Sequence, residues 1–199
     1  MTKIKICGLS RLSDVDRANG LAVEYVGFVF AESRRQVTPP QAEALKARLS
    51  SDIQSVGVFV NDGIQKIEWL VNQHVIDVAQ LHGQEDEAYI QELKKLCPNT
   101  PIWKAVTVEN GVDFTQWDSV DCFVLDNGAG GTGERFDWSL LPTLQITKPY
   151  FLAGGLTPEN VEQALTFAPY GVDVSGGVET DGNKDGNKMK LFVSKVRGI

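Results

Sequence analysis

The sequence predicts a single (β/α)₈ barrel that comprises residues 1–199. Eight short apolar runs recur along the chain, and their starts lie 20 to 30 residues apart. The runs are nearly continuous in hydrophobicity, which is typical of parallel strands buried on both faces. Segments with helical periodicity separate them and supply the crossover that each parallel connection requires. No linker or shift in composition divides the chain, so a closed barrel is favoured over an open doubly wound sheet.

The eight predicted strands each run into polar or turn-forming residues. In chain order they are KIKICGL from Lys3, YVGFVF from Tyr25, SVGVFV from Ser55, VAQLHG from Val78, IWKAVTV from Ile102, CFVLDN from Cys122, YFLAGGL from Tyr150 and GVDVSGG from Gly171. The length of the chain lies near the lower limit of about 200 residues for this fold. We therefore expect a compact barrel with short connections.

Several connecting segments have an apolar face with helical spacing. These are residues 39–50 with Ala42, Leu45 and Leu49, residues 85–97 with Tyr89, Leu93, Leu96 and Cys97, and residues 188–197 with Met189, Phe192, Val193 and Val196. Capping patterns predict two helix starts, at Ser13 with Asp16 three residues on and at Thr157 followed by Pro158. Amphipathic helices are thus expected to cover the outside of the barrel.

Two connections are predicted to differ from the rest. Residues 109–121, between the fifth and sixth strands, leave room for one or two helical turns only. The DGNKDGNK stretch at 181–188 is rich in turn-forming residues and is predicted to be a surface loop before the last helix.

Charge and cysteine content exclude several classes of function. The formal charge of -7 argues against binding to nucleic acid or to an anionic membrane, which requires a basic face. No stretch approaches the roughly 18 apolar residues of a membrane span, and the first residues lack a signal-peptide pattern, so we expect a cytoplasmic protein. The three cysteines, Cys7, Cys97 and Cys122, lack the spacing of a disulfide framework or a zinc site and are expected to be reduced thiols.

Glycine pairs follow the last two predicted strands. In (β/α)₈ barrels the active site lies at the carboxyl ends of the strands, and the loops after strands seven and eight frequently bind phosphate. Gly154-Gly155 and Gly176-Gly177 let the backbone approach an anion closely, and Ser175 can donate a hydroxyl. Tight turns alone would explain one pair. Two pairs after consecutive last strands favour a phosphate site.

Two strand ends carry candidate acid–base groups. Cys7 ends the first strand, where a thiolate in a partly exposed, positive site is a competent base, although a free cysteine is often a buried packing residue. Asp126 ends the sixth strand after apolar residues. There it either begins a turn or acts as a proton donor whose pKa is raised by desolvation. Cys97 and Cys122 are assigned to packing.

Cationic and imidazole side chains also follow the strands. Arg34 and Arg35 lie beyond the second strand, where they are either solvated surface charges or a planar group that binds a substrate carboxylate. His82 follows the fourth strand and is either a structural hydrogen-bonding residue or a ligand-binding one. The sequence by itself leaves these alternatives open.

Lys5 and Asp173 are charged residues inside apolar strands. By period-two alternation Lys5 shares a face with Cys7, and Asp173 shares a face with Ser175. The first and eighth strands are neighbours in a closed barrel. Because an unpaired charge in the interior is costly, we expect the two side chains to point inward and pair.

The ordered motifs resemble those of the phosphoribosylanthranilate isomerase family of tryptophan biosynthesis. They are KICGL at 5–9, VGFVF at 26–30, SRRQVTP at 33–39, VGVFVN at 56–61, QLHG at 80–83, VLDN at 124–127, GGTGERFDW at 130–138, LAGGLTPENV at 152–161 and VDVSGGVE at 172–179. Two features differ from many members: Ser175-Gly176-Gly177 stands where many have Ser-Ser-Gly, and the loop between Asp126 and Gly130 is short compared with some.

The resemblance implies an Amadori rearrangement of N-(5-phosphoribosyl)anthranilate to an aminoketose without a cofactor. By matching position, Cys7 is implied to remove the proton from C2 of the sugar and Asp126 to protonate the ring oxygen. Arg35 is implied to bind the anthranilate carboxylate, with the phosphate at Gly154, Gly155, Ser175, Gly176 and Gly177; His82 and Asp173 complete the expected substrate site. We expect a monomer or homodimer that acts on this small phosphorylated substrate.

Two other functions compete with this one. A histidine-pathway aminoaldose isomerase has a similar barrel and related chemistry but generally uses paired aspartates, which Cys7 in the first strand argues against. A barrel that binds a phosphorylated metabolite without catalysis would bind phosphate ligands and show no turnover. Mixing the protein with fresh phosphoribosylanthranilate and following anthranilate fluorescence separates these alternatives.

Overall fold

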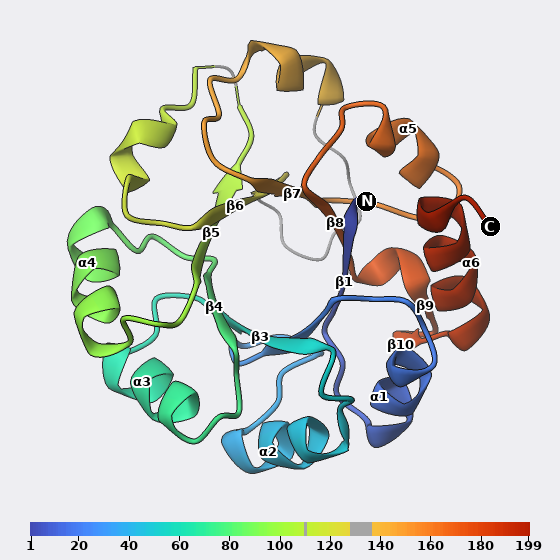
Figure 1. The fold of residues 1–199 in the computed structure, drawn as a ribbon, viewed down its shortest axis with the longest axis horizontal. Helices are drawn as coiled ribbons and strands as arrows, with labels where there is room; N and C mark the ends of the chain where they lie inside the picture. Colours follow the sequence, from blue (N-terminus) through green and yellow to red (C-terminus); the bar gives the residue numbers. More distant parts are fainter. Residues whose placement is uncertain (110, 128–136) are drawn as a thin grey trace.

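The computed structural model describes residues 1–109, 111–127 and 137–199. In this part of the chain, eight parallel strands form a closed barrel in sequential order. The strands are β1 (Lys3–Cys7), β2 (Tyr25–Val29), β3 (Gln54–Phe59), β4 (Val78–Leu81), β5 (Ile102–Thr107), β6 (Cys122–Asp126), β7 (Tyr150–Leu152) and β8 (Gly171–Val174). Figure 1 shows the strands as an inner ring surrounded by helices. The predicted (β/α)₈ barrel is confirmed.

The helices form the outer layer and differ in length around the ring. They are α1 (Leu12–Asn19), α2 (Pro39–Arg48), α3 (Ile64–Asn72), α4 (Glu87–Leu96), α5 (Val161–Leu165) and α6 (Gly186–Arg197), with 3₁₀ helices η1 (Phe114–Trp117), η2 (Trp138–Thr143) and η3 (Gly176–Val178). The helices predicted at 39–50, 85–97 and 188–197 are present with shifted ends. In the described part of the short connection predicted after the fifth strand, the only helix is η1, of four residues. No helix among the described residues is long and apolar enough to cross a membrane.

Two predicted helix starts are wrong. Helix α1 is capped by Arg11 and Asp14, because the Asp14 carboxylate accepts from the Arg11 backbone N–H at 3.2 Å. Asp16 instead pairs with Arg48 on the surface. Thr157 makes the expected local turn, since its hydroxyl accepts from the Glu159 N–H, but helix α5 begins only at Val161.

The stretch 181–188 was expected to be a loop, and this prediction is wrong. Residues Asn183–Lys184 form strand β10, which pairs antiparallel with β9 (Glu179–Thr180), and α6 already begins at Gly186. Lys184 is buried and its Nζ lies 2.6 Å from Glu179 Oε1. This ion pair joins the two strands of an ordered hairpin.

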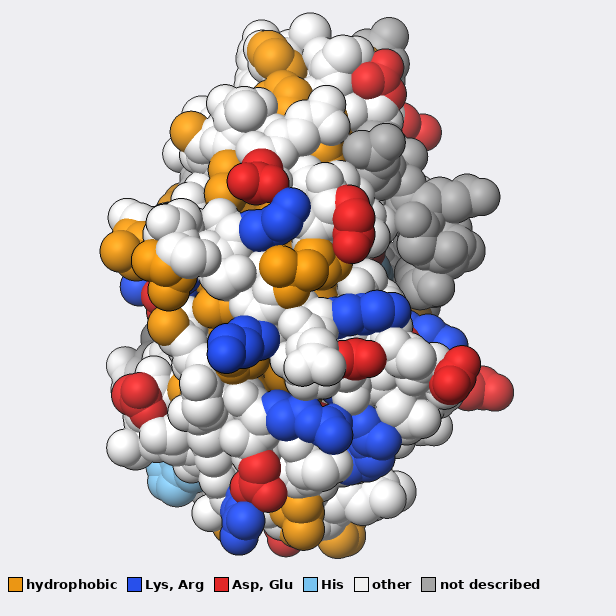
Figure 2. Space-filling view, turned by 90° about the vertical axis from the view of Figure 1, so that its right-hand side faces the viewer, with side chains coloured by type: hydrophobic (Ala, Val, Ile, Leu, Met, Phe, Trp, Pro, Cys, Tyr) orange, Lys and Arg blue, Asp and Glu red, His pale blue; other side chains and the backbone are white. Residues whose placement is uncertain are grey.

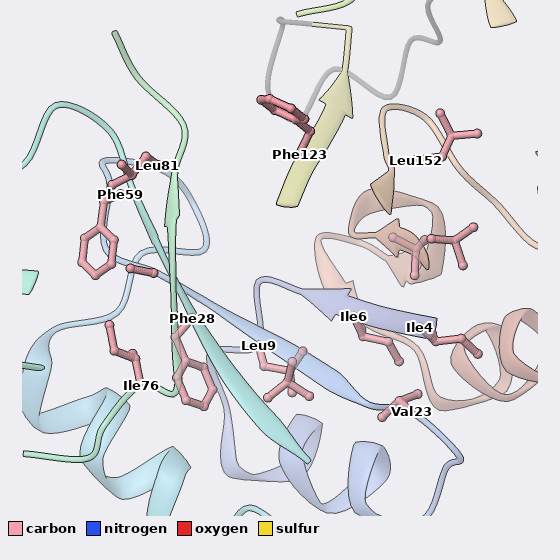
Figure 3. Close-up of a cluster of buried hydrophobic side chains, with 14 of the residues drawn as sticks. Ile4, Ile6, Leu9, Val23, Phe28, Phe59, Ile76, Leu81, Phe123 and Leu152 are labelled. Carbon is pink, nitrogen blue, oxygen red and sulfur yellow. The ribbon is translucent and has the colours of Figure 1, made fainter. Parts of the chain in front are cut away.

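Side chains of the strands alternate between two cores. Outward-facing residues such as Ile4 and Ile6 pack against the helices in a large apolar layer, part of which is seen in Figure 3. Inward-facing residues fill the barrel with a smaller cluster: Val56, Val78, Trp103, Ala105, Cys122, Val124, Phe151 and Ala153. Cys97 and Cys122 are both buried in these cores, as predicted. These side chains fill the interior of the barrel below the carboxyl ends of the strands. A ligand therefore has to bind at those carboxyl ends.

The surface beside α5 and α6 mixes charges of both signs. Figure 2 shows Lys and Arg side chains on this side of the molecule with Asp and Glu side chains among them and hydrophobic ones scattered. Individual ion pairs, such as Lys195 with Glu162 at 2.9 Å, link the two helices. Exposed pairs of this kind contribute about 0–1 kcal/mol each to stability.

Candidate active site

One cavity of about 290 Å³ opens at the carboxyl ends of the strands. Ten of the candidate residues line it: Cys7, Arg35, His82, Asp126, Gly154, Gly155, Asp173, Ser175, Gly176 and Gly177. These residues come from six strand ends and loops that are distant in sequence. The barrel brings them together because all parallel strands point their carboxyl ends to the same rim.

Cys7 and Lys5 point inward from β1, as the alternation of the strand predicts. Cys7 is partly buried. Its Sγ lies against the backbone of Gly27 on β2, where a Cβ would come within 2.6 Å of the sulfur. Gly27 thus gives the thiol the space to lie on the inner face, a requirement that the strand pattern did not reveal.

Lys5 and Asp173 form the predicted buried ion pair between β1 and β8. They are register partners in the sheet, and Lys5 Nζ lies 2.6 Å from Asp173 Oδ2. Burial disfavours the charged lysine, but the attraction of Asp173 and Cys7 outweighs it, so the pKa of Lys5 is raised. The other carboxylate oxygen, Asp173 Oδ1, is buried without a hydrogen-bond partner among the described residues. That oxygen is free to accept from a ligand.

The electrostatic environment of Cys7 differs from the simple positive site that was expected. Burial raises the pKa of the Cys7 thiol, and the carboxylate of Asp173 raises it further. Lys5 and Lys184 act in the opposite direction, but the net effect keeps the pKa above its ordinary value. The thiol of the free protein is therefore predominantly protonated at neutral pH.

His82 lies between Gln80 and Asp126. Its Nε2 is 3.6 Å from Asp126 Oδ2, and its Nδ1 is 3.3 Å from Gln80 Nε2. Burial lowers the pKa of His82 although Asp126 opposes the shift, so the ring is neutral at neutral pH. Gln80 is buried, and its Oε1 has no hydrogen-bond partner among the described residues. Gln80 also lines the cavity, although the sequence did not assign it to the site.

Asp126 lies at the end of β6 against the loop that follows β7. Its Oδ1 accepts from the Asn127 backbone N–H at 2.6 Å. Gly154 has a left-handed φ of 74°, and a Cβ there would come within 2.9 Å of the same Oδ1. Glycine at this position therefore leaves room for the carboxyl group at the cavity wall.

The loops after β7 and β8 approach each other closely. A Cβ at Gly177 would clash with the Leu156 carbonyl, so only glycine permits this contact. In the described part of the chain, the N–H groups of Gly154 and Gly155 donate no hydrogen bond. The Ser175 hydroxyl lines the cavity and donates to the Cys7 carbonyl at 3.0 Å. Its role as a phosphate donor stays a prediction.

Arg35 reaches the cavity from the loop after β2 and is held by a residue that sequence reasoning left unassigned. Its Nε and Nη2 donate to the two carboxylate oxygens of Glu179 at 2.7 and 2.9 Å. The guanidinium lies beside Gly176, where a Cβ would be 3.5 Å from Nη2. Arg34 also contacts Glu179, but its side chain is 56% exposed and it does not line the cavity.

The described residues include no group of three or more His, Cys, Asp or Glu side chains arranged to hold a metal ion. The site contains the Cys7 thiol, the Asp126 carboxyl group with an adjacent neutral imidazole, the Asp173 carboxylate paired with Lys5, a fixed guanidinium and a glycine-lined wall. The short loop after Asp126 that the sequence analysis noted falls on residues 128–136. These residues lie outside the described part of the chain.

Comparisons with known proteins point to one family. The family model of N-(5'phosphoribosyl)anthranilate (PRA) isomerase matches residues 4–195. The chain is 44% identical to the N-(5'-phosphoribosyl)anthranilate isomerase of Caldanaerobacter subterraneus subsp. tengcongensis, with 100% of both chains covered. It is similar to the crystal structure of phosphoribosyl anthranilate isomerase from Thermus thermophilus, with a TM-score of 0.88, 30% identity and 99% of each chain covered. A phosphoribosyl anthranilate isomerase in complex with reduced 1-(o-carboxyphenylamino)-1-deoxyribulose 5-phosphate matches with a TM-score of 0.85, 33% identity and 100% of each chain covered.

Proposed function

The chain belongs to the N-(5'-phosphoribosyl)anthranilate isomerase family, and we propose that its barrel-end cavity carries out the family's Amadori rearrangement with Cys7 and Asp126 as the acid–base pair. The substrate is N-(5'-phosphoribosyl)anthranilate, and the product is 1-(2-carboxyphenylamino)-1-deoxyribulose 5-phosphate. The observation that carries the proposal is the presence of a thiol from β1 and a carboxyl group from β6 in one cavity of about 290 Å³. An isomerisation of this kind requires one proton donor and one proton acceptor at the sugar.

Each group has a defined step. The protonated Asp126 carboxyl donates its proton to the ring oxygen, the C1–O bond breaks, and the nitrogen lone pair forms a C=N bond at C1. The Cys7 thiolate then removes the proton from C2, the C–H electrons form a C1=C2 double bond, and the C=N electrons return to nitrogen. The resulting enolamine loses the proton of its C2 hydroxyl and gains a proton at C1, which gives the ketone at C2. Neutral His82, 3.6 Å from Asp126, places no formal positive charge next to the carboxyl group.

The remaining groups of the cavity position the substrate. We assign the phosphate to the backbone donors of Gly154, Gly155, Gly176 and Gly177, supported by the close approach of the two loops. Asp173 Oδ1 and Gln80 Oε1 are buried acceptors without partners among the described residues. An unpaired buried acceptor is costly, so hydroxyl groups of the sugar are suitable donors for both.

Arg35 is assigned to the anthranilate carboxylate, and its replacement tests this. Arg35→Ala should raise KM by about 10- to 100-fold with a smaller effect on kcat, because a charge-assisted anchor remote from the reacting carbons is lost. Steady-state kinetics with the natural substrate measure the effect.

A substrate analogue provides the control for that prediction, since the guanidinium also lies beside Gly176. N-(5'-phosphoribosyl)aniline lacks the carboxylate but keeps the phosphate. Wild-type and Arg35→Ala proteins should bind it equally well. An equal loss of affinity for both substrates would instead place Arg35 at the phosphate.

The raised pKa of Cys7 predicts the pH dependence of the rate. A base acts in its deprotonated form, and below the pKa the thiolate fraction grows about tenfold per pH unit. In Asp126→Asn the general acid no longer titrates, so kcat/KM of that variant should keep rising through neutral and mildly alkaline pH, because the pKa of the thiol lies above its ordinary value. A pH profile of kcat/KM that is flat across this range in Asp126→Asn would contradict Cys7 as the base.

The overall reaction is tested by mixing the purified protein with freshly prepared substrate and following anthranilate fluorescence. Product should form far faster than the substrate breaks down spontaneously. Tight binding without turnover would indicate a barrel that only binds phosphorylated metabolites. Turnover of a histidine-pathway aminoaldose, followed in a separate assay, would show a second substrate. We expect the protein to act in the cytoplasm as a monomer or homodimer.

A further inference from the structure

Glu179 is a buried carboxylate that gathers three cations beside the cavity. It lies in β9 with 8% of its surface exposed. Its oxygens accept from Arg35, from Arg34 Nη2 at 2.7 Å and from Lys184 Nζ at 2.6 Å. Hydrogen bonds from Arg35 and Lys184, together with their charges, lower the pKa of Glu179 to about 2 against the opposing effect of burial. The carboxylate is thus ionised at every pH at which the protein would be assayed.

The contact between Glu179 and Arg35 uses one edge of the guanidinium. Nε and Nη2 face the two carboxylate oxygens in a bidentate arrangement, whereas Nη1 donates no hydrogen bond in the described part of the chain. A guanidinium has a second edge, formed by Nη1 and Nη2, that also matches a carboxylate. With the first edge on Glu179, the second is left for a ligand.

The aliphatic part of the Arg35 side chain is confined as well. It passes over Gly8, where a Cβ would clash with Arg35 Cδ. Only 11% of the Arg35 side chain is exposed. Gly8 has a φ of 80° and no side chain to displace the aliphatic part. The guanidinium is therefore fixed at two points, by packing on Gly8 and by the fork on Glu179.

We propose that Glu179 is a positioning residue that presents the free edge of Arg35 to the carboxylate of the anthranilate ring. This rests on the proposed function, because it requires that Arg35 binds that carboxylate. Glu179 itself does not line the cavity. Its role follows from geometry, since a prealigned anchor loses little conformational freedom when the ligand binds.

The loss of the negative charge and the loss of the aligned contact should change the substrate affinity of a Glu179→Gln variant in opposite directions. Removing a negative charge beside three cations should strengthen the binding of an anionic substrate. Losing the bidentate fork should weaken it, because the glutamine amide has only one acceptor oxygen and its NH₂ group repels a guanidinium donor. Our proposal requires that alignment dominates, so KM should rise.

The experiment measures kcat and KM for Glu179→Gln with both substrates. With the natural substrate, KM should rise about tenfold while kcat changes by less than about threefold. With N-(5'-phosphoribosyl)aniline, the variant should match the wild type. A lower or unchanged KM with the natural substrate, or an equal loss with both substrates, would overturn the proposal.

Two further variants serve as controls for this experiment. Glu179→Asp keeps the charge but shortens the side chain, so it should reproduce the rise in KM and also serves if Glu179→Gln fails to fold in a thermal-unfolding scan. Arg34→Ala is the matched control, because Arg34 contacts Glu179 without lining the cavity, and its kinetics should stay within about twofold of the wild type. An Arg34→Ala effect as large as that of Glu179→Gln would show general disruption of the cation cluster.

A double variant separates this inference from the proposed function. In the Arg35→Ala background, Glu179→Gln should cause no further rise in KM, because its effect acts through Arg35. Additive losses would overturn the positioning role. If wild type is active and Arg35→Ala weakens binding while Glu179→Gln is normal, only the inference fails. If wild type shows no turnover, the proposed function itself fails.

Discussion

Asp126→Asn should lower kcat by about 10²- to 10⁴-fold, because it removes the only proton that the side chain can donate to the ring oxygen. The substitution conserves shape. The asparagine Oδ1 can still accept from the Asn127 N–H, and the space beside Gly154 is unchanged. Binding of a product analogue and the thermal unfolding temperature should therefore stay near those of the wild type.

The same chemical change at an exposed carboxylate serves as control. Asp118 has a side chain that is 92% exposed and lies outside the cavity, so Asp118→Asn should leave kcat and KM unchanged. Single-turnover measurements can show that the slow step in Asp126→Asn is chemistry rather than product release. A kcat within a few-fold of the wild type would exclude Asp126 as the general acid.

Cys7→Ser should lower kcat by about 10²-fold or more. The hydroxyl replaces the sulfur in almost the same space against Gly27, but a serine hydroxyl is far less acidic than a thiol. Even with Lys5 and Lys184 nearby, it does not supply an anionic base at neutral pH. The alkaline rise of kcat/KM that is expected in Asp126→Asn should be absent when Cys7→Ser is combined with it.

Cys97→Ser is the control for the loss of a sulfur. Cys97 is buried between the helices and the sheet, outside the cavity, so its replacement should affect stability without removing catalysis. Measuring activity well below the unfolding temperature separates the two effects. If Cys7→Ser and Asp126→Asn both retained near-wild-type activity, the assignment of the acid–base pair would be refuted.

Much of the site was predictable from local patterns. The alternation in KIKIC predicts that Lys5 and Cys7 face inward, and the structure confirms the resulting pair between Lys5 and Asp173. The common cavity of Cys7 and Asp126 follows from the same rule, because parallel strands of a barrel end at one rim. Their chemical roles remain proposals that the variants above test.

Other features depend on partners that no local pattern names. The capping pattern at Ser13 and Asp16 was a reasonable local signal, but Asp14 accepts the capping hydrogen bond and Asp16 binds Arg48, 32 residues away. Thr157 forms a local turn, but helix α5 does not begin there. Several arrangements of polar residues satisfy the same short-range rules, and packing of the folded chain selects among them.

The sequence by itself determined the barrel, its inward-facing residues and the gathering of the candidate groups at one rim, because the alternation of a strand and the direction of parallel strands are repeating local properties. Only the tertiary structure decided that Ser175 donates to the Cys7 carbonyl, that burial raises the pKa of Cys7, and that Glu179 with Lys184 turns residues 179–184 into a hairpin beside Arg35. The contacts of Ser175 with Cys7 and of Glu179 with Arg35 join groups that are far apart in the chain. Such contacts form only once the barrel has closed.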